Sequence, residues 1–267
     1  MQKQRLLIFD MDGTSIDDSG NLNKYTAEAM RIMEREKIPF MIATGRSPGG
    51  VRPFQQKHDF NCAMVLHNGS LTILGDEIIH SEGISKAEAK KILTFIDSLG
   101  FETSVNIHSY DDWIVRDKGS KLNLREEKLT LEISRQGTID TLEHDIIHKI
   151  FCIFEDFDAT IEFQKLLRAE FPDYYIVESA QDRVELMKKG INKLVGIKAA
   201  LRHLGFKLED TVVFGDNYND LEMIEAAGIS FAMGNAVQAL KDKADYVIGD
   251  NNGTAILETL RKFAFIP

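Results

Sequence analysis

Short apolar runs that end at a polar residue recur in the first part of the chain. Leu6–Phe9, Phe40–Ala43 and Ala63–Leu66 contain no charged side chain, which is typical of strands buried on both faces of a parallel sheet. A helical stretch at about Tyr25–Lys37 separates the first two runs. This alternation predicts an α/β sheet with helices on both faces.

The pattern changes between about residues 81 and 189. Ser85 and Glu88 have capping-box spacing and predict a helix that ends near Leu99. Strands follow one another with few helices between them, and a charged stretch, LREEKLTLE, has no assigned element. We expect strands at Phe101–Asn106, Trp113–Val115, Ile150–Phe154, Tyr174–Glu178 and Val184–Met187, and a helix at about Ala159–Glu170. Such an order indicates a separate α+β module.

The α/β alternation returns after Asn192. An apolar helical stripe ends at Gly205, and strands are expected at Val212–Phe214, Ile229–Ala232 and Tyr246–Ile248. We therefore predict a Rossmann-like, doubly wound parallel-sheet core formed by residues 1–80 and 190–267. Residues 81–189 would be an α+β cap domain inserted at a loop, where insertions are tolerated.

The charge balance narrows the classes of function. A net charge of -10 argues against general binding to nucleic acids or anionic membranes, which requires an excess of Lys and Arg. Cys62 and Cys152 lie in apolar runs without metal-ligand spacing, so we expect buried thiols in a reducing compartment. The apolar run that ends at Phe9 is too short for a signal peptide, and no run could span a membrane. We expect a cytoplasmic protein.

Two carboxylates directly follow the first predicted strand, in the motif DMDGT. Asp10 and Asp12 would lie at the carboxyl end of the sheet, where open α/β folds bind their ligands. One could attack a substrate while the other transfers protons. Gly13 would permit the tight turn that directs both side chains to one point.

Three further polar positions follow predicted core elements. Thr44 follows the second strand and could bind a phosphoryl oxygen or simply cap the turn. Lys193 lies in the first turn of a helix, where the helix dipole disfavours a cation unless an anion lies nearby. The motif GDNYND contains Asp216, Asn219 and Asp220, oxygen ligands of the type that Mg²⁺ prefers. Asp220 could also be the N-cap of the next helix.

Taken together, these motifs resemble those of a known family. DMDGT, ATGRS, Lys193 within GINKLVGIKAAL, and GDNYND followed by AMGNA are similar to the four ordered motifs of the haloacid dehalogenase-like superfamily. The chain is most similar to its Cof-type phosphatases with a IIB cap. The resemblance covers essentially the whole chain. Ser15 departs from the pattern, because the family usually has an apolar residue there.

The resemblance implies a role for each matching residue. Asp10 would form an aspartyl-phosphate, and Asp12 would act as acid and then base. Thr44 and Lys193 would hold phosphoryl oxygens. Mg²⁺ would be bound by Asp10, the Asp12 carbonyl and Asp216, with Asn219 and Asp220 completing or orienting the site. Further candidates for substrate contact are Gly45, Arg46, Asn68 and Asn219, and in the cap the segment Tyr110–Trp113 with Arg116, unless Trp113 is a core residue.

The expected activity is hydrolysis of small phosphate monoesters, such as sugar phosphates or phosphorylated cofactors. A phosphomutase or phosphotransferase could use the same residues, and a catalytically inactive phosphate-binding protein is a further alternative. A phospho-receiver module is disfavoured, because it would need about half this length and has no counterpart of Asp12. The sequence does not indicate the particular metabolite or the oligomeric state.

Overall fold

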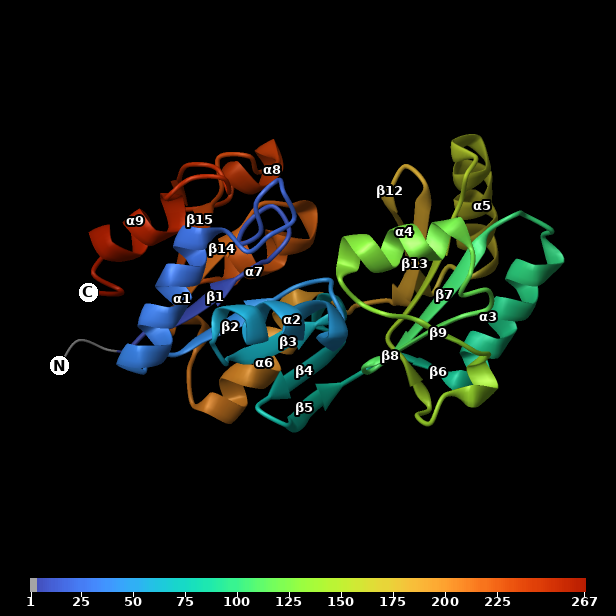
Figure 1. Ribbon diagram of the computed structural model, residues 1–267, viewed down its shortest axis with the longest axis horizontal. Helices are drawn as coiled ribbons and strands as arrows, with labels where there is room; N and C mark the ends of the chain where they lie inside the picture. The colour runs from blue at the N-terminus through green and yellow to red at the C-terminus, as the bar shows by residue number, and fades with distance from the viewer. Residues whose placement is uncertain (1–3) are drawn as a thin grey trace. The chain divides into compact units, whose positions relative to one another are not determined.

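The computed structural model describes residues 4–267, which form two compact units (Figure 1). The first unit comprises residues 4–46, 51–80 and 192–267, and the second comprises residues 47–50 and 81–191. The role of the second unit as a cap stays a prediction.

The first unit is built on an eight-stranded sheet in the order β16-β15-β14-β1-β2-β3-β4-β5. Its strands are β1 (Leu6–Phe9), β2 (Phe40–Ala43), β3 (Ala63–Leu66), β4 (Leu71–Leu74), β5 (Glu77–Ser81), β14 (Thr211–Gly215), β15 (Ile229–Ala232) and β16 (Tyr246–Val247). The strands from β16 to β3 pair in parallel, whereas β4 is antiparallel to β3. The predicted parallel-sheet core is confirmed, and β4 and β5 extend it beyond the strands that we predicted.

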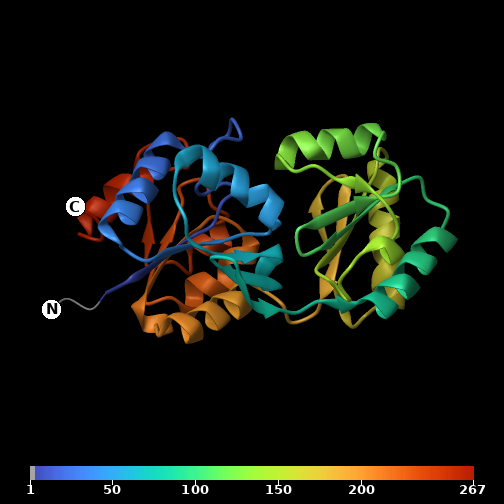
Figure 2. The same ribbon diagram turned by 60° about the horizontal axis from the view of Figure 1, so that its bottom comes forward.

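Helices cover both faces of this sheet. They are α1 (Lys24–Glu36), α2 (Pro48–His58), α6 (Lys193–Leu204), α7 (Leu221–Ala226), α8 (Gln238–Lys241) and α9 (Ala255–Lys262). Helix α1 packs against α9, and α6 packs against β3, β4 and α7. Figure 2 shows α1 and α6 on opposite sides of the sheet. This arrangement confirms the doubly wound fold.

Burial explains why the central strands are apolar throughout. All four residues of β1 are buried, as are all five of β14. Phe9 stacks on Phe214 with ring centroids 5.0 Å apart, and Phe214 stacks on Phe231 at 4.9 Å. Asp10 and Asp216 come directly after β1 and β14, which are parallel neighbours. The fold therefore places both carboxylates at the carboxyl edge of the sheet, the usual ligand-binding edge of open α/β folds.

The second unit contains a six-stranded sheet in the order β12-β13-β11-β7-β8-β9 and a two-stranded sheet of β10 and β6. The strands are β6 (Ile84–Ser85), β7 (Ser104–Ser109), β8 (Asp112–Val115), β9 (Arg135–Gln136), β10 (Ile146–Ile147), β11 (Lys149–Ile153), β12 (Tyr174–Ala180) and β13 (Arg183–Lys188). The helices are α3 (Lys86–Ser98), α4 (Lys121–Thr130) and α5 (Phe157–Glu170). Apart from the parallel pair β8–β9, the strands pair antiparallel. The predicted α+β composition is confirmed.

The helices of the second unit differ in how well their sequences indicated them. The capping box of Ser85 and Glu88 is present at the start of α3. The charged stretch LREEKLTLE, which had no assigned element, lies in α4 and the residues after it. Its buried side chains are Asn123 and Glu126, so no apolar period marked this helix. The strand expected at Phe101–Asn106 begins only at Ser104.

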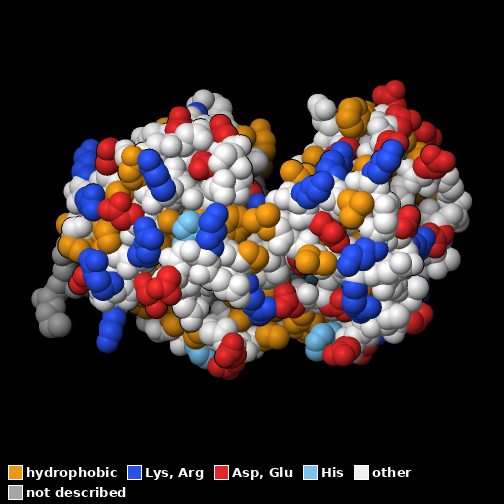
Figure 3. Space-filling model, in the orientation of Figure 1, with side chains coloured by type: hydrophobic (Ala, Val, Ile, Leu, Met, Phe, Trp, Pro, Cys, Tyr) orange, Lys and Arg blue, Asp and Glu red, His pale blue; other side chains and the backbone are white. Residues whose placement is uncertain are grey.

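The charged side chains and the two cysteines are placed as the sequence led us to expect. Acidic and basic side chains are interspersed on the face of the molecule shown in Figure 3. Within residues 4–267 there is no helix of the length and apolarity that crossing a membrane requires. Cys62 and Cys152 are free and buried, and burial raises the pKa of each thiol to about 12. The expectation of buried thiols is confirmed.

Candidate active site

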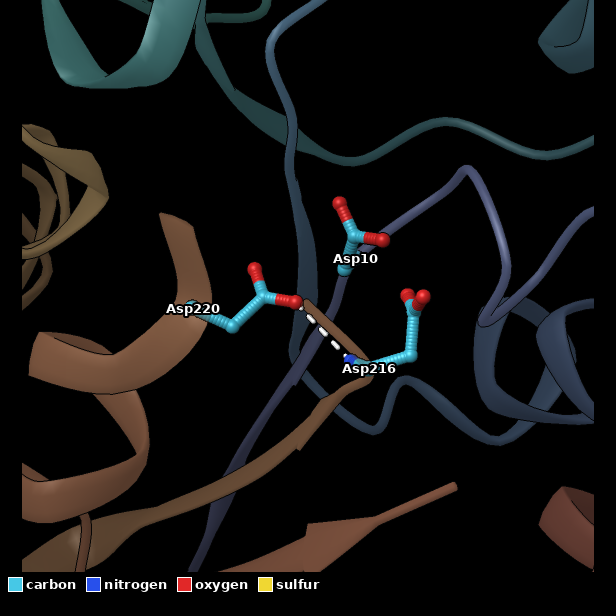
Figure 4. Close-up of side chains that lie close together, drawn as sticks. All are labelled: Asp10, Asp216 and Asp220. Atoms are coloured by element: carbon cyan, nitrogen blue, oxygen red, sulfur yellow. Dashed lines mark hydrogen bonds between the residues drawn. The ribbon is translucent and has the colours of Figure 1, made fainter. Parts of the chain in front are cut away.

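Three carboxylates meet at the carboxyl edge of the core sheet. Asp10 follows β1, Asp216 follows β14, and Asp220 ends the short helix η4 (Tyr218–Asp220). Each offers one oxygen, and these oxygens lie within 4.8 Å of one another. Figure 4 shows the side chains of the three residues gathered at this edge. All three are buried, so the structure brings together three of the predicted metal ligands.

The GDNYND turn is closed by the side chain of Asp220. Its Oδ2 accepts hydrogen bonds from the backbone N–H groups of Asp216 at 2.9 Å and Asn217 at 3.0 Å. Asp220 occupies the N-cap position of α7 but makes no side-chain hydrogen bond to that helix. The expectation that Asp220 is the N-cap residue of α7 is thus confirmed, although its carboxylate bonds to the preceding loop and not to the helix.

Lys193 joins two of these carboxylates. It is the first residue of α6 and is only 1% exposed. Its Nζ lies 2.5 Å from Asp10 Oδ1 and 2.5 Å from Asp220 Oδ1. These two anions offset the unfavourable position of a cation at a helix N-terminus. The expectation of an anion near Lys193 is therefore confirmed.

The electrostatics of the cluster show an excess of negative charge. Burial raises the pKa of Asp10 well above its ordinary value, although Lys193 opposes this shift. Burial likewise raises the pKa of Asp216 to about 6. For Lys193, burial would lower the pKa, but the Asp10 and Asp220 carboxylates outweigh it and raise the pKa. One buried ammonium thus faces three carboxylates, and a divalent cation with oxygen ligands fits the remaining charge.

The residues after Asp10 pack onto this cluster. Gly13 has a φ of +79°, and a Cβ atom at this position would collide with the Asp216 carboxylate. Thr14 Oγ1 donates to Asp216 Oδ1 at 2.8 Å, a role that we did not predict even though Thr14 lies within the DMDGT motif. Ser15 Oγ donates to the backbone oxygen of Asp10 at 2.6 Å. This hydrogen bond satisfies the Ser15 hydroxyl where the family usually has an apolar residue.

Asp12, unlike the three buried carboxylates, is exposed. Its side chain is 58% exposed and is bound by the guanidinium of Arg46. Arg46 Nε donates to Asp12 Oδ2 at 2.9 Å, and Nη2 donates to Oδ1 at 2.7 Å. The guanidinium also lies over the Phe54 ring at 5.4 Å. The Asp12 carboxylate is thus accessible from solvent, as proton exchange with a substrate would require.

The other expected substrate contacts lie at the ends of β2 and β3. Thr44 is fully buried, and its Oγ1 accepts a hydrogen bond from the Arg46 N–H at 3.2 Å, so it does cap this turn. The Asn68 backbone N–H donates to the Thr44 main-chain oxygen at 3.0 Å. Asn219 Nδ2 donates to Asn68 Oδ1 at 3.0 Å, and the Asn68 amide also borders Gly45. The structure therefore gathers these positions into one group.

The candidate substrate-contact residues Trp113 and Arg116 of the second unit bind other residues of the same unit. Trp113 is 2% exposed, and its Nε1 donates to Asn106 Oδ1 at 3.0 Å, which confirms the interpretation of Trp113 as a core residue. Arg116 is paired with Asp97. These contacts stabilise the second unit itself.

Comparison with known proteins agrees with the motif pattern. The family model of haloacid dehalogenase-like hydrolases matches residues 7–260. The HMP-PP phosphatase of Cronobacter sakazakii is 29% identical over 240 residues, which cover 88% of this chain and 86% of the relative. The pyridoxal phosphate phosphatase of Escherichia coli is 26% identical over 277 residues, with 95% and 96% covered. The solved structure of a subclass IIB sugar phosphatase of this superfamily shares the fold, with a TM-score of 0.80, 23% identity, and 98% and 100% covered.

Proposed function

Because this chain belongs to the haloacid dehalogenase-like hydrolase family, we propose that it is a Mg²⁺-dependent phosphatase that uses Asp10 as its phosphoryl acceptor. Its substrates are small phosphate monoesters. One observation carries the proposal: the Lys193 ammonium contacts both Asp10 and Asp220 within a buried cluster of three carboxylates. A phosphate monoester is an anion, and its approach to a carboxylate requires this kind of charge neutralisation.

In the first half of the reaction, an oxygen of the Asp10 carboxylate attacks phosphorus. The ester P–O bond breaks as the new Asp10–phosphorus bond forms. Asp12 donates a proton to the leaving oxygen, so that an alcohol departs. Lys193 stays bound to Asp10 Oδ1, which leaves Oδ2 as the attacking atom.

In the second half, a water molecule attacks the phosphorus of the aspartyl-phosphate. Asp12 accepts a proton from this water, and the bond between Asp10 and phosphorus breaks. Inorganic phosphate is released and both carboxyl groups return to their starting states. An exposed Asp12 suits both half-reactions, because the same side chain must first give a proton and then take one.

The proposed metal ligands are Asp10, Asp216, the main-chain oxygen of Asp12, and Asn219 and Asp220, which complete or orient the site. When bound, Mg²⁺ supplies positive charge that offsets the repulsion between the attacking carboxylate and the phosphate. Thr14 orients Asp216 through its hydrogen bond. The raised pKa values of Asp10 and Asp216 support the assignment, since this excess of buried charge calls for a cation.

The substrate class follows from the relatives and from the remaining polar groups. The two relatives described above are named as phosphatases of HMP-PP and of pyridoxal phosphate, both small phosphorylated molecules. In this chain we assign the phosphoryl contacts to Thr44, Gly45, Lys193 and Asn219, and further substrate contacts to Arg46 and Asn68. The second unit is proposed to act as the cap, which excludes water during the reaction.

The test is release of phosphate from p-nitrophenyl phosphate and from a panel of sugar phosphates and phosphorylated cofactors. The assay is run with Mg²⁺, with EDTA, and with the variant Asp10→Asn. We expect release that requires the metal and is lost in the variant. A folded, Mg²⁺-supplied protein that releases no phosphate from any substrate would overturn the proposal and favour a phosphotransferase or a phosphate-binding protein.

A further inference from the structure

Asparagine side chains attach the segment after Asp10 to the loop between β16 and α9. Asn23 Nδ2 donates to the backbone oxygens of Asn251 at 2.9 Å and Gly253 at 3.1 Å. Asn251 Nδ2 donates to the Ile16 oxygen at 2.8 Å. These bonds link positions more than 220 residues apart in the sequence, and they fix the path of the chain that leaves the candidate active site.

Asn235 extends this set of contacts to the DMDGT motif. Its Nδ2 donates to the Gly13 oxygen at 2.8 Å. Its Oδ1 accepts a hydrogen bond from the Asn251 N–H at 3.2 Å. Because the amide is held from both ends, only one orientation of the side chain satisfies both partners.

The Gly13 carbonyl is one residue from each of two groups in the site. Asp12 precedes it, and Thr14, whose hydroxyl donates to Asp216 Oδ1, follows it. Gly13 itself has a positive φ and lies directly against the Asp216 carboxylate. A rotation of the peptide after Gly13 would therefore displace Thr14 from Asp216 and change the direction of the Asp12 side chain.

We propose that Asn235 is a positioning residue for this reaction. By holding the Gly13 carbonyl it sets Thr14 on Asp216, and thus the geometry of the metal ligands, and it sets Asp12 relative to Asp10. The inference rests on the proposed function, but its effect on metal binding is separable from catalysis. Groups that orient metal ligands typically change affinity or activity about 10–100-fold when they are replaced.

Two substitutions at Asn235 test this proposal. Asn235→Ala removes both hydrogen bonds, whereas Asn235→Asp retains an acceptor for the Asn251 N–H and turns an acceptor toward the Gly13 oxygen. Asn235 is exposed, so neither change leaves a buried cavity, and circular dichroism with thermal unfolding checks the fold. The Mg²⁺ Kd is measured by calorimetry, and kcat and KM are measured with p-nitrophenyl phosphate.

We expect the Mg²⁺ Kd to rise and kcat to fall, each about tenfold, with a smaller change in KM. The added charge of Asn235→Asp would by itself tighten Mg²⁺ binding, so weaker binding in this variant reports the displaced Gly13 peptide. Asn252→Ala is the matched control, because the Asn252 side chain also joins the two segments but does so through hydrogen bonds with Asp18. It should leave both quantities within about twofold of wild type.

A Mg²⁺ Kd and a kcat within twofold of wild type in both Asn235 variants would overturn the inference. Equal losses in Asn252→Ala would also overturn it, because they would show a general effect of loosening the loop. If the wild-type protein hydrolyses no substrate, the proposed function is wrong. The Mg²⁺ Kd of the Asn235 variants, relative to that of wild type, still tests whether Asn235 positions Gly13.

Discussion

Lys193 Nζ lies 2.5 Å from Asp10 Oδ1 and reaches Asp220 Oδ1 at the same distance. A single buried ammonium therefore connects the proposed nucleophile to the turn that carries the other two carboxylates. The contact also explains why the chain places a lysine at the first position of α6. Without these anions, the cation would be unfavourable both in its burial and in its position at the helix N-terminus.

Replacing Lys193 should destabilise the metal-free protein and inactivate the enzyme. Lys193→Met leaves two carboxylates buried without their cation, and removing one partner of a buried ion pair costs about 3–5 kcal/mol. The free energy of unfolding in EDTA at pH 7 measures this loss. We expect kcat to fall by at least about 100-fold, as for the loss of a group that stabilises transition-state charge.

The matched control for this substitution is Lys243→Met. Lys243 is paired with Glu225, but its side chain is 55% exposed, and exposed pairs contribute only about 0–1 kcal/mol. An equal loss of stability in the two variants would contradict the assigned role of Lys193.

Thr14→Val should weaken metal binding without removing a ligand. The substitution keeps the shape of the side chain but removes the hydrogen bond to Asp216 Oδ1. In the wild-type protein this hydrogen bond lowers the pKa of the buried Asp216 carboxyl. We expect the pKa of Asp216 to rise and the Mg²⁺ Kd, measured by calorimetry, to increase about 10–100-fold. Thr14→Ser retains the hydroxyl and should stay close to wild type. An unchanged Kd in Thr14→Val would show that the hydrogen bond does not orient Asp216.

The pKa of Asp216 predicts the pH dependence of the metal-free protein. Burial raises the pKa of this carboxyl to about 6, whereas an Asp in an unfolded chain titrates near 4. The folded state therefore binds the proton more tightly, and the contribution of Asp216 to stability declines as the pH rises from about 4 to about 6. Mg²⁺ needs the ionised carboxylate, so its affinity should rise over the same range.

Two titrations check this prediction. The free energy of unfolding in EDTA is measured from pH 4 to pH 7 for wild type and for Asp216→Asn, and the difference between them isolates Asp216. Calorimetry gives the Mg²⁺ Kd of wild type between pH 5 and pH 7. A Kd that stays constant over this range would be incompatible with the raised pKa.

Replacing the Asp12 side chain should lower kcat but leave Mg²⁺ binding nearly unchanged. The Asp12 side chain lies on Arg46, outside the cluster of Asp10, Asp216 and Asp220, and Asp12→Asn keeps its main-chain oxygen. We expect kcat to fall about 10²–10⁴-fold, the usual contribution of an acid–base group, with a Mg²⁺ Kd within about threefold of wild type. Loss of metal binding in Asp12→Asn would instead make its carboxylate a ligand.

Hydrophobic pattern predicted the core sheet well because its strands are buried on both faces. The bounds of β1, β2 and β3 match apolar runs in the sequence residue for residue, and β15 also has the bounds that we predicted. In β1, β2 and β3 every side chain is buried, so the apolar run and the strand coincide. The chain reversal that adds β4 and β5 was not predicted, because nothing in the apolar runs marks where an antiparallel extension begins.

Prediction was poorer where packing uses polar side chains. Helix α4 buries Asn123 and Glu126, and Glu126 pairs with Arg183, so its packed side has no apolar stripe. At the candidate site, the carboxylates and Lys193 could be named because each follows a core strand or starts a core helix. The roles of Thr14 and Asn235 depend on contacts between residues about 200 positions apart or more, which no local pattern encodes.

The central claim is that Asp10 carries the phosphoryl group during turnover. The direct measurement is to quench the enzyme rapidly during turnover of p-nitrophenyl phosphate with Mg²⁺ and to treat it with borohydride, which reduces an acyl phosphate to an alcohol. Mass spectrometry of the peptide that contains Asp10 then reports its side chain. The account predicts homoserine at position 10, dependent on substrate and metal. An enzyme that turns over under these conditions with an unmodified Asp10 would contradict it.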